Sequence, residues 1–343
     1  MKHIEISKRI FHFKQPAGTS RGIYTTRQCY FLTLTDDGMP GIKGVGECSP
    51  LPKLSCDDLP DYETILHQIC KLVESTDKIP YDLLRPYPSI LFGLETAFAQ
   101  LKAHGSTMLF DTPFGRGEEG IRINGLVWMG SFDEMAERLE AKLRQGFHCV
   151  KLKIGAIDFE KEIELIRHIR KSFDKRQVEL RVDANGAFTP KNALQHLETL
   201  AKYDIHSIEQ PIKQHQWKDI AHLCADSPLP IALDEELIGV NIATMKEALL
   251  DTIRPQYIVL KPSLHGGMRG MEEWIRLANA RGIGSWITSA LESNIGLNAI
   301  AQLCAKVYGP HVSTPQGLGT GQLFTDNIEM PLTIRGDEMW ITQ

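Results

Sequence analysis

The 343-residue sequence has no long hydrophobic run and no block of basic residues. A membrane-spanning helix needs about 20 consecutive apolar residues, and no stretch approaches that length. The net charge is −5, so neither nucleic acid nor an anionic membrane is predicted as a partner. The first residues alternate like a strand and lack the apolar centre of a signal peptide.

The sequence also lacks the residue spacings of several common sites. Its seven cysteines are odd in number and show no CxxC spacing. This predicts reduced thiols in a cytoplasmic protein and argues against a disulfide framework or a zinc site. The twelve histidines show no metal-ligand spacing. No GxGxxG follows a predicted strand, which argues against a dinucleotide-binding fold.

From about residue 120 the sequence repeats strand-like and helix-like segments. Eight strand candidates follow in order: 121–128, 148–154, 178–184, 205–210, 229–235, 257–262, 284–289 and, more weakly, 311–315. Lys153, Asp183, Glu209, Asp234 and Lys261 mark the period, with 30, 26, 25 and 27 residues between successive members. A period of this kind predicts βα units and a parallel sheet. Eight strands in a row favour closure into a (β/α)7β TIM-type barrel.

Residues 1–118 have a different pattern, with strand-like segments first and helix-like segments after them. We expect a separate α+β domain over 1–118 and the barrel over 119–322. The segment 323–343 is largely strand-like again, and we expect it to return to the first domain.

Local signals predict where some helices begin. Ser131 followed by Glu134 has the pattern of a capping box. The run 158–173 has apolar residues at helical spacing. Thr189 before Pro190 predicts a third helix start, with threonine as the N-cap and proline at the first helical position.

Charged residues lie at the predicted strand ends, where barrels of this type carry their chemistry. Alternation places Lys151 and Lys153 on one face of their strand. If these faces point inward, Asp183, Glu209 and Asp234 converge. Three converging carboxylates need a cation, and an all-oxygen set with few protein ligands favours Mg²⁺ over Ca²⁺. Mg²⁺ bound to a substrate carboxylate can stabilise the enediolate formed when the α-proton leaves.

The two neighbouring lysines have a chemical explanation in such a site. A lysine that removes a proton must be neutral, and a second ammonium two residues away favours the neutral form. Taken singly, a strand lysine is more often part of a solvated face, and Asp-Ala-Asn-Gly is more often a turn. Six charges at six phased strand ends are harder to attribute to chance, so a catalytic site is the better interpretation.

These residues resemble those of a known family. The order of five motifs is similar to the signature of the enolase superfamily, muconate-lactonizing subgroup: Lys151-Leu152-Lys153, Asp183-Ala184-Asn185-Gly186, Ile208-Glu209-Gln210-Pro211, Leu233-Asp234-Glu235 and Leu260-Lys261-Pro262. The segment 44–52 resembles the family's capping-domain loop, and 289–293 resembles its seventh-strand segment. The resemblance implies that the first domain is a cap over the barrel.

Within the subgroup the sequence most resembles the o-succinylbenzoate synthases of menaquinone biosynthesis. Their reaction is the syn dehydration of 2-succinyl-6-hydroxy-2,4-cyclohexadiene-1-carboxylate. The resemblance implies that Lys153 is the base and then the acid, and that Lys261 supports the enediolate as a cation. It also implies Mg²⁺, with Mn²⁺ as a substitute, and a small carboxylate substrate. The implied metal ligands are Asp183, Glu209 and Asp234, and the implied substrate contacts are Lys151, Arg181, Asn185 and Ser289. The loop around Arg21 is rich in glycine, serine and threonine, and we expect it to order over the succinyl chain with Arg21 near the carboxylate. The alternative is a solvated surface loop.

The resemblance further implies that loops 16–24 and 49–56 close over the mouth and select the substrate. Two relatives compete with the synthases. Dipeptide epimerases carry Asp-X-Asp on the last strand, whereas here no acid follows residue 312 before Asp326. N-succinylamino acid racemases share both lysines and stay open. Two other hypotheses also stay open: that a lysine forms a Schiff base with the substrate, and that the barrel binds a ligand without catalysing a reaction. The sequence does not indicate the oligomeric state.

Overall fold

The computed structural model describes residues 1–19, 22–128, 130–155 and 157–342. Its centre is a parallel sheet of seven strands, paired in sequence order from β5 to β11. The strands are β5 (Gly125–Val127), β6 (Cys149–Lys153), β7 (Glu179–Asp183), β8 (Ser207–Glu209), β9 (Ile231–Leu233), β10 (Tyr257–Leu260) and β11 (Gly284–Ile287). Each falls within a strand candidate of the sequence.

A short eighth segment joins the two edges of this curled sheet. Gln316 pairs in parallel with Ile123, just before β5, and Gly317 pairs with Thr288, just after β11. The hydrogen bonds from Asn124 N to Gln316 O and from Gly317 N to Ile287 O measure 3.0 and 2.8 Å. The ring is therefore joined by residues that follow the expected strand 311–315, and the barrel prediction is confirmed.

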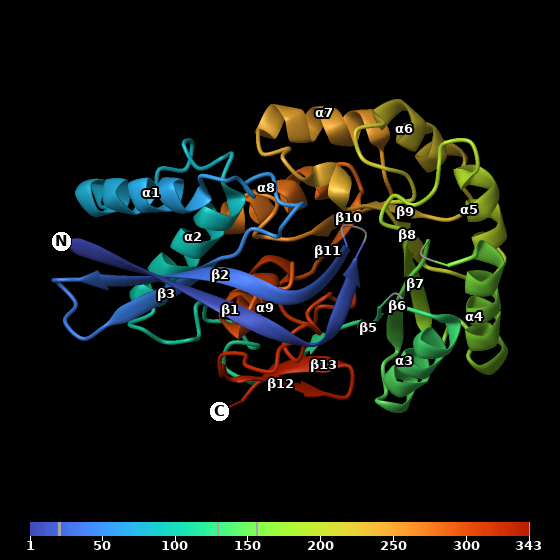
Figure 1. Cartoon of the computed structure of the whole chain (residues 1–343), viewed down its shortest axis with the longest axis horizontal. Coiled ribbons are helices and arrows are strands. Elements are labelled where there is room, and N and C mark those ends of the chain that lie inside the picture. Colours follow the sequence, from blue (N-terminus) through green and yellow to red (C-terminus); the bar gives the residue numbers. More distant parts are fainter. Residues whose placement is uncertain (20–21, 129, 156, 343) are drawn as a thin grey trace.

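A helix follows each of the seven strands. They are α3 (Phe132–Arg144), α4 (Phe159–Ser172), α5 (Ala193–Ala201), α6 (Trp217–Asp226), α7 (Ala243–Ile253), α8 (Gly267–Asn279) and α9 (Asn294–Tyr308), with a short 3₁₀ turn η1 (Glu235–Leu237) before α7. Figure 1 shows α4 to α7 along the outer side of the parallel sheet. The strands are almost wholly buried because helices cover one face and the barrel interior the other.

Two of the predicted helices begin where the sequence indicated, and a third does not. Ser131 and Glu134 form the expected capping box at α3, and α4 begins after Asp158, whose side chain accepts from the Glu160 amide. The prediction at Thr189 was wrong, since α5 begins at Ala193. The Thr189 amide and hydroxyl both donate to Asn192 Oδ1 at 2.8 Å, so the intervening residues form a turn.

The first domain joins an antiparallel sheet to two helices. The sheet has the order β1 (Lys2–Thr19), β2 (Gly22–Asp36), β3 (Lys43–Cys48), and the helices are α1 (Tyr62–Thr76) and α2 (Pro88–Lys102). A Cβ on Gly46 would lie 1.8 Å from the Gly93 carbonyl oxygen, so α2 packs against β3 at a distance that only glycine allows. In Figure 1 this domain lies against α8 and α9, which α2 also contacts.

Two buried glutamates fasten the first domain to the barrel. Glu47, on β3, accepts hydrogen bonds from the amides of Ser293 and Gly296 at the start of α9, both 2.9 Å long. Glu95, on α2, accepts from the amides of Met268 and Arg269 at the start of α8, at 2.5 and 3.1 Å. Carboxyl oxygens satisfy the free amides at the start of a helix. The cap is thus positioned by the helices that follow β10 and β11.

The C-terminal segment contacts both parts of the molecule. Lys14 N donates to Leu323 O, and Thr325 N donates to His12 O, so residues 323–325 lie along β1. The hairpin of β12 (Leu332–Arg335) and β13 (Glu338–Ile341) pairs instead with β4 (Ile121–Arg122), at the start of the barrel. The domain boundaries at residues 118 and 322 remain a proposal. Among the described residues, no helix combines the length and apolar character needed to cross a membrane.

Candidate active site

Strand register brings the predicted residues together at one end of the barrel. Lys153 on β6 is the direct neighbour of Asp183 on β7, and Asp183 is the direct neighbour of Glu209 on β8. Glu209 in turn pairs with Ala232 on β9, and Asp234 follows two residues later. Because side chains two residues apart share a face, all three carboxylates belong to the barrel's inner face. Lys261 comes directly after β10.

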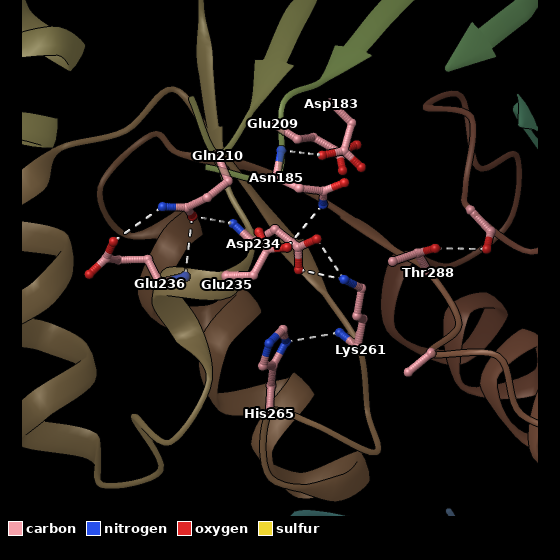
Figure 2. A network of polar contacts seen from close by, with 12 residues as sticks. Asp183, Asn185, Glu209, Gln210, Asp234, Glu235, Glu236, Lys261, His265 and Thr288 are labelled. Carbon is pink, nitrogen blue, oxygen red and sulfur yellow. Dashed lines mark hydrogen bonds and ion pairs between the residues drawn. The ribbon is translucent and has the colours of Figure 1, made fainter. Parts of the chain in front are cut away.

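Each carboxylate has a lysine partner. Lys151 Nζ lies 3.0 Å from Asp183 Oδ2 and 2.7 Å from Glu209 Oε2. Lys153 Nζ lies 3.2 Å from Asp183 Oδ2. On the other side, Lys261 Nζ lies 2.6 and 2.5 Å from the two oxygens of Asp234, toward which it points in Figure 2. These six side chains form a largely buried ring of lysines and carboxylates at the strand ends.

Burial and neighbouring charges set the protonation states in this ring. Burial disfavours the charged form of Lys151, but Asp183, Glu209 and Asp234 outweigh it and raise the lysine's pKa. Asp234 and Glu235 likewise outweigh burial and raise the pKa of Lys261. Burial opposes ionisation of Asp183, yet Lys151 and Lys153 lower its pKa. Lys151 and Lys261 are therefore persistent cations.

Asn185 links the β6 lysine to an additional acid. Its Oδ1 accepts from Lys153 Nζ at 2.7 Å, and its Nδ2 donates to Glu235 Oε1 at 2.9 Å, as Figure 2 shows for the second contact. Burial raises the pKa of Glu235 to about 7, with Asp234 adding to the effect. Asn185 has a φ of 44°, within the expected turn after β7. An asparagine tolerates this left-handed conformation better than most residues.

Two further groups hold the strand ends in place. Gln210 Oε1 accepts from the amides of Asp234 and Glu236, each at 3.2 Å. His265 Nδ1 accepts the Lys261 amide at 2.9 Å, and burial together with Lys261 keeps the imidazole pKa well below its usual value. Neutral His265 thus fixes the backbone of Lys261 without competing for a proton. The Gly266-Gly267 turn beyond it has positive φ at both residues.

The donor set fits a hard divalent cation, although its oxygens are paired with lysines here. In the described part of the chain, no three His, Cys, Asp or Glu side chains are gathered around a single metal position. Glu209 Oε1 is nevertheless buried without a hydrogen-bond partner, and burial raises the pKa of Glu209 to about 7. An unsatisfied carboxylate oxygen between two other carboxylates is a suitable ligand for Mg²⁺.

A pocket opens above the charged ring. Its apolar wall is formed by Tyr24 on β2, Leu51 and Leu54 from the loop after β3, and Ala290 and Leu291 from the loop after β11. The wall nearest β5 carries Trp128, whose ring centre lies 6.0 Å from Lys153 Nζ. The pocket is therefore charged on one side and apolar on the other, which suits a carboxylate attached to a carbon ring.

A second recess adjoins this pocket, and the two share Asn124, Leu126, Trp128, Gly319 and Thr320. Its described lining contains three cations and no acid. The cations are Lys14, Arg138 and Lys142. The stem of Lys142 lies against β5 because Gly125 has no side chain: a Cβ there would lie 3.1 Å from Lys142 Cδ.

Comparison with known proteins agrees with this geometry. The profile described as "Enolase C-terminal domain-like" matches residues 134–339. The o-succinylbenzoate synthase of Desulfotalea psychrophila is 48% identical, over 94% of this chain and 95% of that protein. The crystal structure of MenC from Desulfotalea psychrophila LSv54 has a TM-score of 0.83 at 42% identity, covering 99% of both chains.

The chain belongs to the o-succinylbenzoate synthase family of the enolase superfamily. The L-Ala-D/L-Glu epimerase of Bacillus subtilis is a more distant relative, 26% identical over 88% of this chain and 84% of that protein. A substrate-liganded structure of the Bacillus subtilis epimerase has a TM-score of 0.84 at 22% identity, which shows a common fold.

Most residues proposed from the sequence of this synthase-family chain line the pocket. Lys151, Lys153, Asp183, Asn185, Asp234, Lys261 and Ser289 do so. Glu209 lies beneath them, fully buried against Lys151. Ser289 Oγ bonds Thr320 Oγ1 at 2.5 Å.

Arg181 is not brought to the pocket. It is fully buried two residues before Asp183, donates to Glu179 Oε1 and Pro315 O, and stacks on Trp286. The alternation of side chains along β7 predicted the face of the strand on which Arg181 lies. It did not predict that Arg181 lies too far from the strand end to reach the pocket. Arg21 lies outside the described residues. Trp128 and Glu235 were not predicted as site residues. Each could have been found from its place, because the aromatic Trp128 and the acidic Glu235 both end a predicted strand.

Proposed function

We propose that the chain catalyses the syn dehydration of 2-succinyl-6-hydroxy-2,4-cyclohexadiene-1-carboxylate to o-succinylbenzoate. The observation that carries the proposal is the pair of lysines on separate strands, Lys153 on β6 and Lys261 after β10, around a buried carboxylate cluster. The 48% identical relative carries the name of this reaction.

Asp183, Glu209 and Asp234 would hold Mg²⁺, for which Mn²⁺ could substitute. When bound, the ion would supply positive charge for the substrate carboxylate and for the enediolate that develops next to it. Lys151 bonds two of these three carboxylates, so its ammonium would keep them oriented and add to the positive charge that the substrate carboxylate meets.

Lys153 would perform both proton transfers. Its neutral amine removes the proton from the carbon that bears the ring carboxylate, and becomes an ammonium. It then gives that proton to the hydroxyl on the same face, the C–O bond breaks, water leaves and the ring becomes aromatic. Asn185 Oδ1, 2.7 Å from Nζ, would hold the amine in position throughout. Lys261 would remain charged and stabilise the enediolate.

The substrate's second carboxylate would lie in the adjoining recess. Lys142 is half-buried there, and burial lowers its pKa. No carboxylate forms an ion pair with Lys142 among the described residues, and its ammonium contacts Gln145 Oε1 and the Phe147 ring instead. An anion at this position would offset the cost of burying the cation. The recess therefore suits the succinyl carboxylate.

Racemisation of N-succinylamino acids is a second candidate, because two lysines on different strands could each reach one face of an α-carbon. Dipeptide epimerisation has less support. After β11 the described pocket lining includes Thr288 and Ser289, and around the eighth segment it includes Gly317, Gly319 and Thr320. None of these residues is an acid that could hold an amino group.

The experiment is a dehydration assay of the purified chain with Mg²⁺, with chelator, and with Mg²⁺ restored. Formation of the aromatic product should stop with chelator and return with metal. The variants Asp183→Asn, Glu209→Gln and Asp234→Asn should each weaken Mg²⁺ binding measured by calorimetry. Full activity in metal-free enzyme would contradict the proposal.

We also propose that the enzyme works in the cytoplasm, in menaquinone biosynthesis. All seven cysteines are free thiols, and six of them are buried. Burial raises the pKa of thiols such as Cys149 and Cys304, so they are poorly reactive structural residues. A set of free thiols is compatible with a reducing compartment.

A further inference from the structure

Leu291 lies in a left-handed backbone conformation in the wall of the pocket. Its φ is 65°, it is 7% exposed, and it lies in the loop between β11 and α9. A bulky side chain rarely adopts this conformation, because its Cβ crowds the backbone. Such strain persists where surrounding contacts hold the residue, and it is concentrated at functional sites.

Contacts from the capping domain and from the barrel together hold the loop that contains Leu291. Arg27, on β2, donates from Nε to Leu291 O at 3.4 Å and from Nη2 to Ala290 O at 3.5 Å. Within the loop, Glu292 Oε2 accepts the Ala290 amide at 2.6 Å, and Ser263 donates to Glu292 Oε1 at 2.5 Å. Both peptide groups around Ala290 are therefore fixed.

The same guanidinium holds the opposite side of the pocket wall. Arg27 donates to the carbonyl oxygens of Ser49 and Pro50, each at 2.6 Å, immediately before Leu51. Leu51 and Leu291 belong to one buried apolar cluster and both line the pocket. One side chain thus ties a capping-domain loop to a barrel loop at the point where the two meet the substrate space.

This arrangement is costly for stability alone. Arg27 is 1% exposed, and no carboxylate of the described residues forms an ion pair with it. A buried cation without a direct ion pair loses hydration that carbonyl dipoles only partly replace. Burial raises the pKa of Glu292 in the same loop, and Arg27 opposes this shift without bonding the carboxyl directly. An apolar residue could join the two loops at lower cost, which indicates that the directed hydrogen bonds serve the geometry of the loops.

We propose that Arg27 is a positioning residue that keeps Leu291 in its strained conformation, and so shapes the apolar wall that selects the substrate's carbon ring. This inference deepens the proposed function and depends on it for its kinetic readout. Arg27 has no role in proton transfer, since none of its hydrogen bonds reaches Lys153 or Lys261.

A double-mutant cycle of Arg27→Met and Leu291→Gly tests the inference. Glycine adopts positive φ without strain, so a loop with Leu291→Gly no longer needs to be held. Arg27→Met alone should raise KM about tenfold with little change in kcat, as expected for a lost buried hydrogen-bonding group. In the Leu291→Gly background the same change should raise KM less than about threefold.

Hydrogen exchange of residues 289–293 gives a readout that needs no reaction. Arg27→Met should accelerate exchange of the Ala290 and Ser293 amides, and less so in the Leu291→Gly background. If the effect of Arg27→Met on exchange is smaller in the Leu291→Gly background, but the wild type shows no dehydration, the proposed function is refuted. The positioning role of Arg27 would still be supported. The inference would be overturned if Arg27→Met changed amide exchange and KM equally in wild type and in Leu291→Gly. It would also be overturned if Arg27→Met changed neither quantity in either protein.

Two variants complete the design. Arg27→Lys keeps the charge with fewer donors, and should give an intermediate KM if Arg27→Met does not fold. Arg170→Met is the matched control, because Arg170 also binds backbone carbonyls, those of Tyr203, Val178 and Asp204, away from the pocket. It should lower the melting temperature and leave KM unchanged. A KM rise in Arg170→Met equal to that of Arg27→Met would contradict the inference.

Discussion

Lys151 and Lys153 lie two residues apart on one face of β6, yet their surroundings differ. Lys151 contacts two carboxylates, whereas Lys153 contacts one carboxylate oxygen and the Asn185 amide oxygen. The pKa of Lys151 is raised by its acidic neighbours, so Lys151 stays charged. The sequence placed both lysines on the correct face, but only the contacts distinguish the fixed cation from the residue proposed to move protons.

The roles of Lys153 and Lys261 can be separated by substitution. Lys153→Ala should lower the dehydration rate by roughly 10²–10⁴-fold, the usual contribution of general acid–base catalysis. Lys261→Arg keeps the charge beside Asp234 and should retain measurable dehydration, because its proposed role is electrostatic. Steady-state rates of both variants provide the measurement. If Lys261→Arg is as inactive as Lys153→Ala, the purely electrostatic role proposed for Lys261 is wrong.

Lys142 provides a second test at the level of one residue. Lys142→Met should raise KM by about 10- to 100-fold, the cost of losing one charge-assisted hydrogen bond to the succinyl carboxylate. Arg144→Met, on the same helix, also removes a positive charge, but Arg144 is exposed and pairs with Glu140 outside the recess. The control should keep the wild-type KM. Equal effects of the two changes would point to general electrostatics and not to a specific contact.

The βα elements were predictable because each repeats a local pattern. The period of charged strand ends located β6 to β10, and the capping box located α3. The fastening of cap to barrel was not predictable, because Glu47 and Glu95 contact residues 246 and 173 positions later in the chain. Nothing in the local pattern of Glu95 distinguishes it from a surface residue of an amphipathic helix. Arg181 was misplaced for a related reason, since alternation gives a side chain's face and not its depth.

Glu95 should make the stability of the cap–barrel junction depend on pH. Burial raises its pKa from 4.5 to about 8. A carboxyl whose folded-state pKa is above its unfolded value contributes stability at low pH that is lost as pH rises from about 4.5 to 8. Glu95→Gln removes this titration, so its melting temperature relative to wild type should increase between pH 5 and pH 8. Each pKa unit corresponds to about 1.4 kcal/mol.

Melting curves at several pH values check this prediction. Glu63→Gln is a suitable control, because Glu63 is exposed and Lys8 lowers its pKa. Its ionisation is nearly complete above about pH 6 in both states, so the difference from wild type should change little over the same range. If Glu95→Gln shows an equally constant difference, Glu95 is ionised at neutral pH and its amide contacts outweigh burial.

The molecule as a whole combines a barrel that carries the charged residues with a cap that supplies part of the apolar wall. Tyr24, Leu51 and Leu54 reach the pocket from the capping domain, and the buried ring of lysines and carboxylates comes from β6 to β10. Dehydration and racemisation both begin with removal of an α-proton next to a carboxylate, so the ring does not by itself separate the two reactions. The apolar wall and the cationic recess are the parts that favour a ring-shaped dicarboxylate.

The most direct test compares the two reactions on one enzyme preparation. Wild-type enzyme with Mg²⁺ should convert 2-succinyl-6-hydroxy-2,4-cyclohexadiene-1-carboxylate with a kcat/KM of at least about 10⁴ M⁻¹s⁻¹, the lower range for enzymes on their own substrates. The rate is followed as the appearance of aromatic absorbance. In D₂O, α-deuterium exchange into each enantiomer of an N-succinylamino acid should have a much lower kcat/KM. Rapid exchange of both enantiomers with little or no dehydration would contradict the account and identify the chain as a racemase.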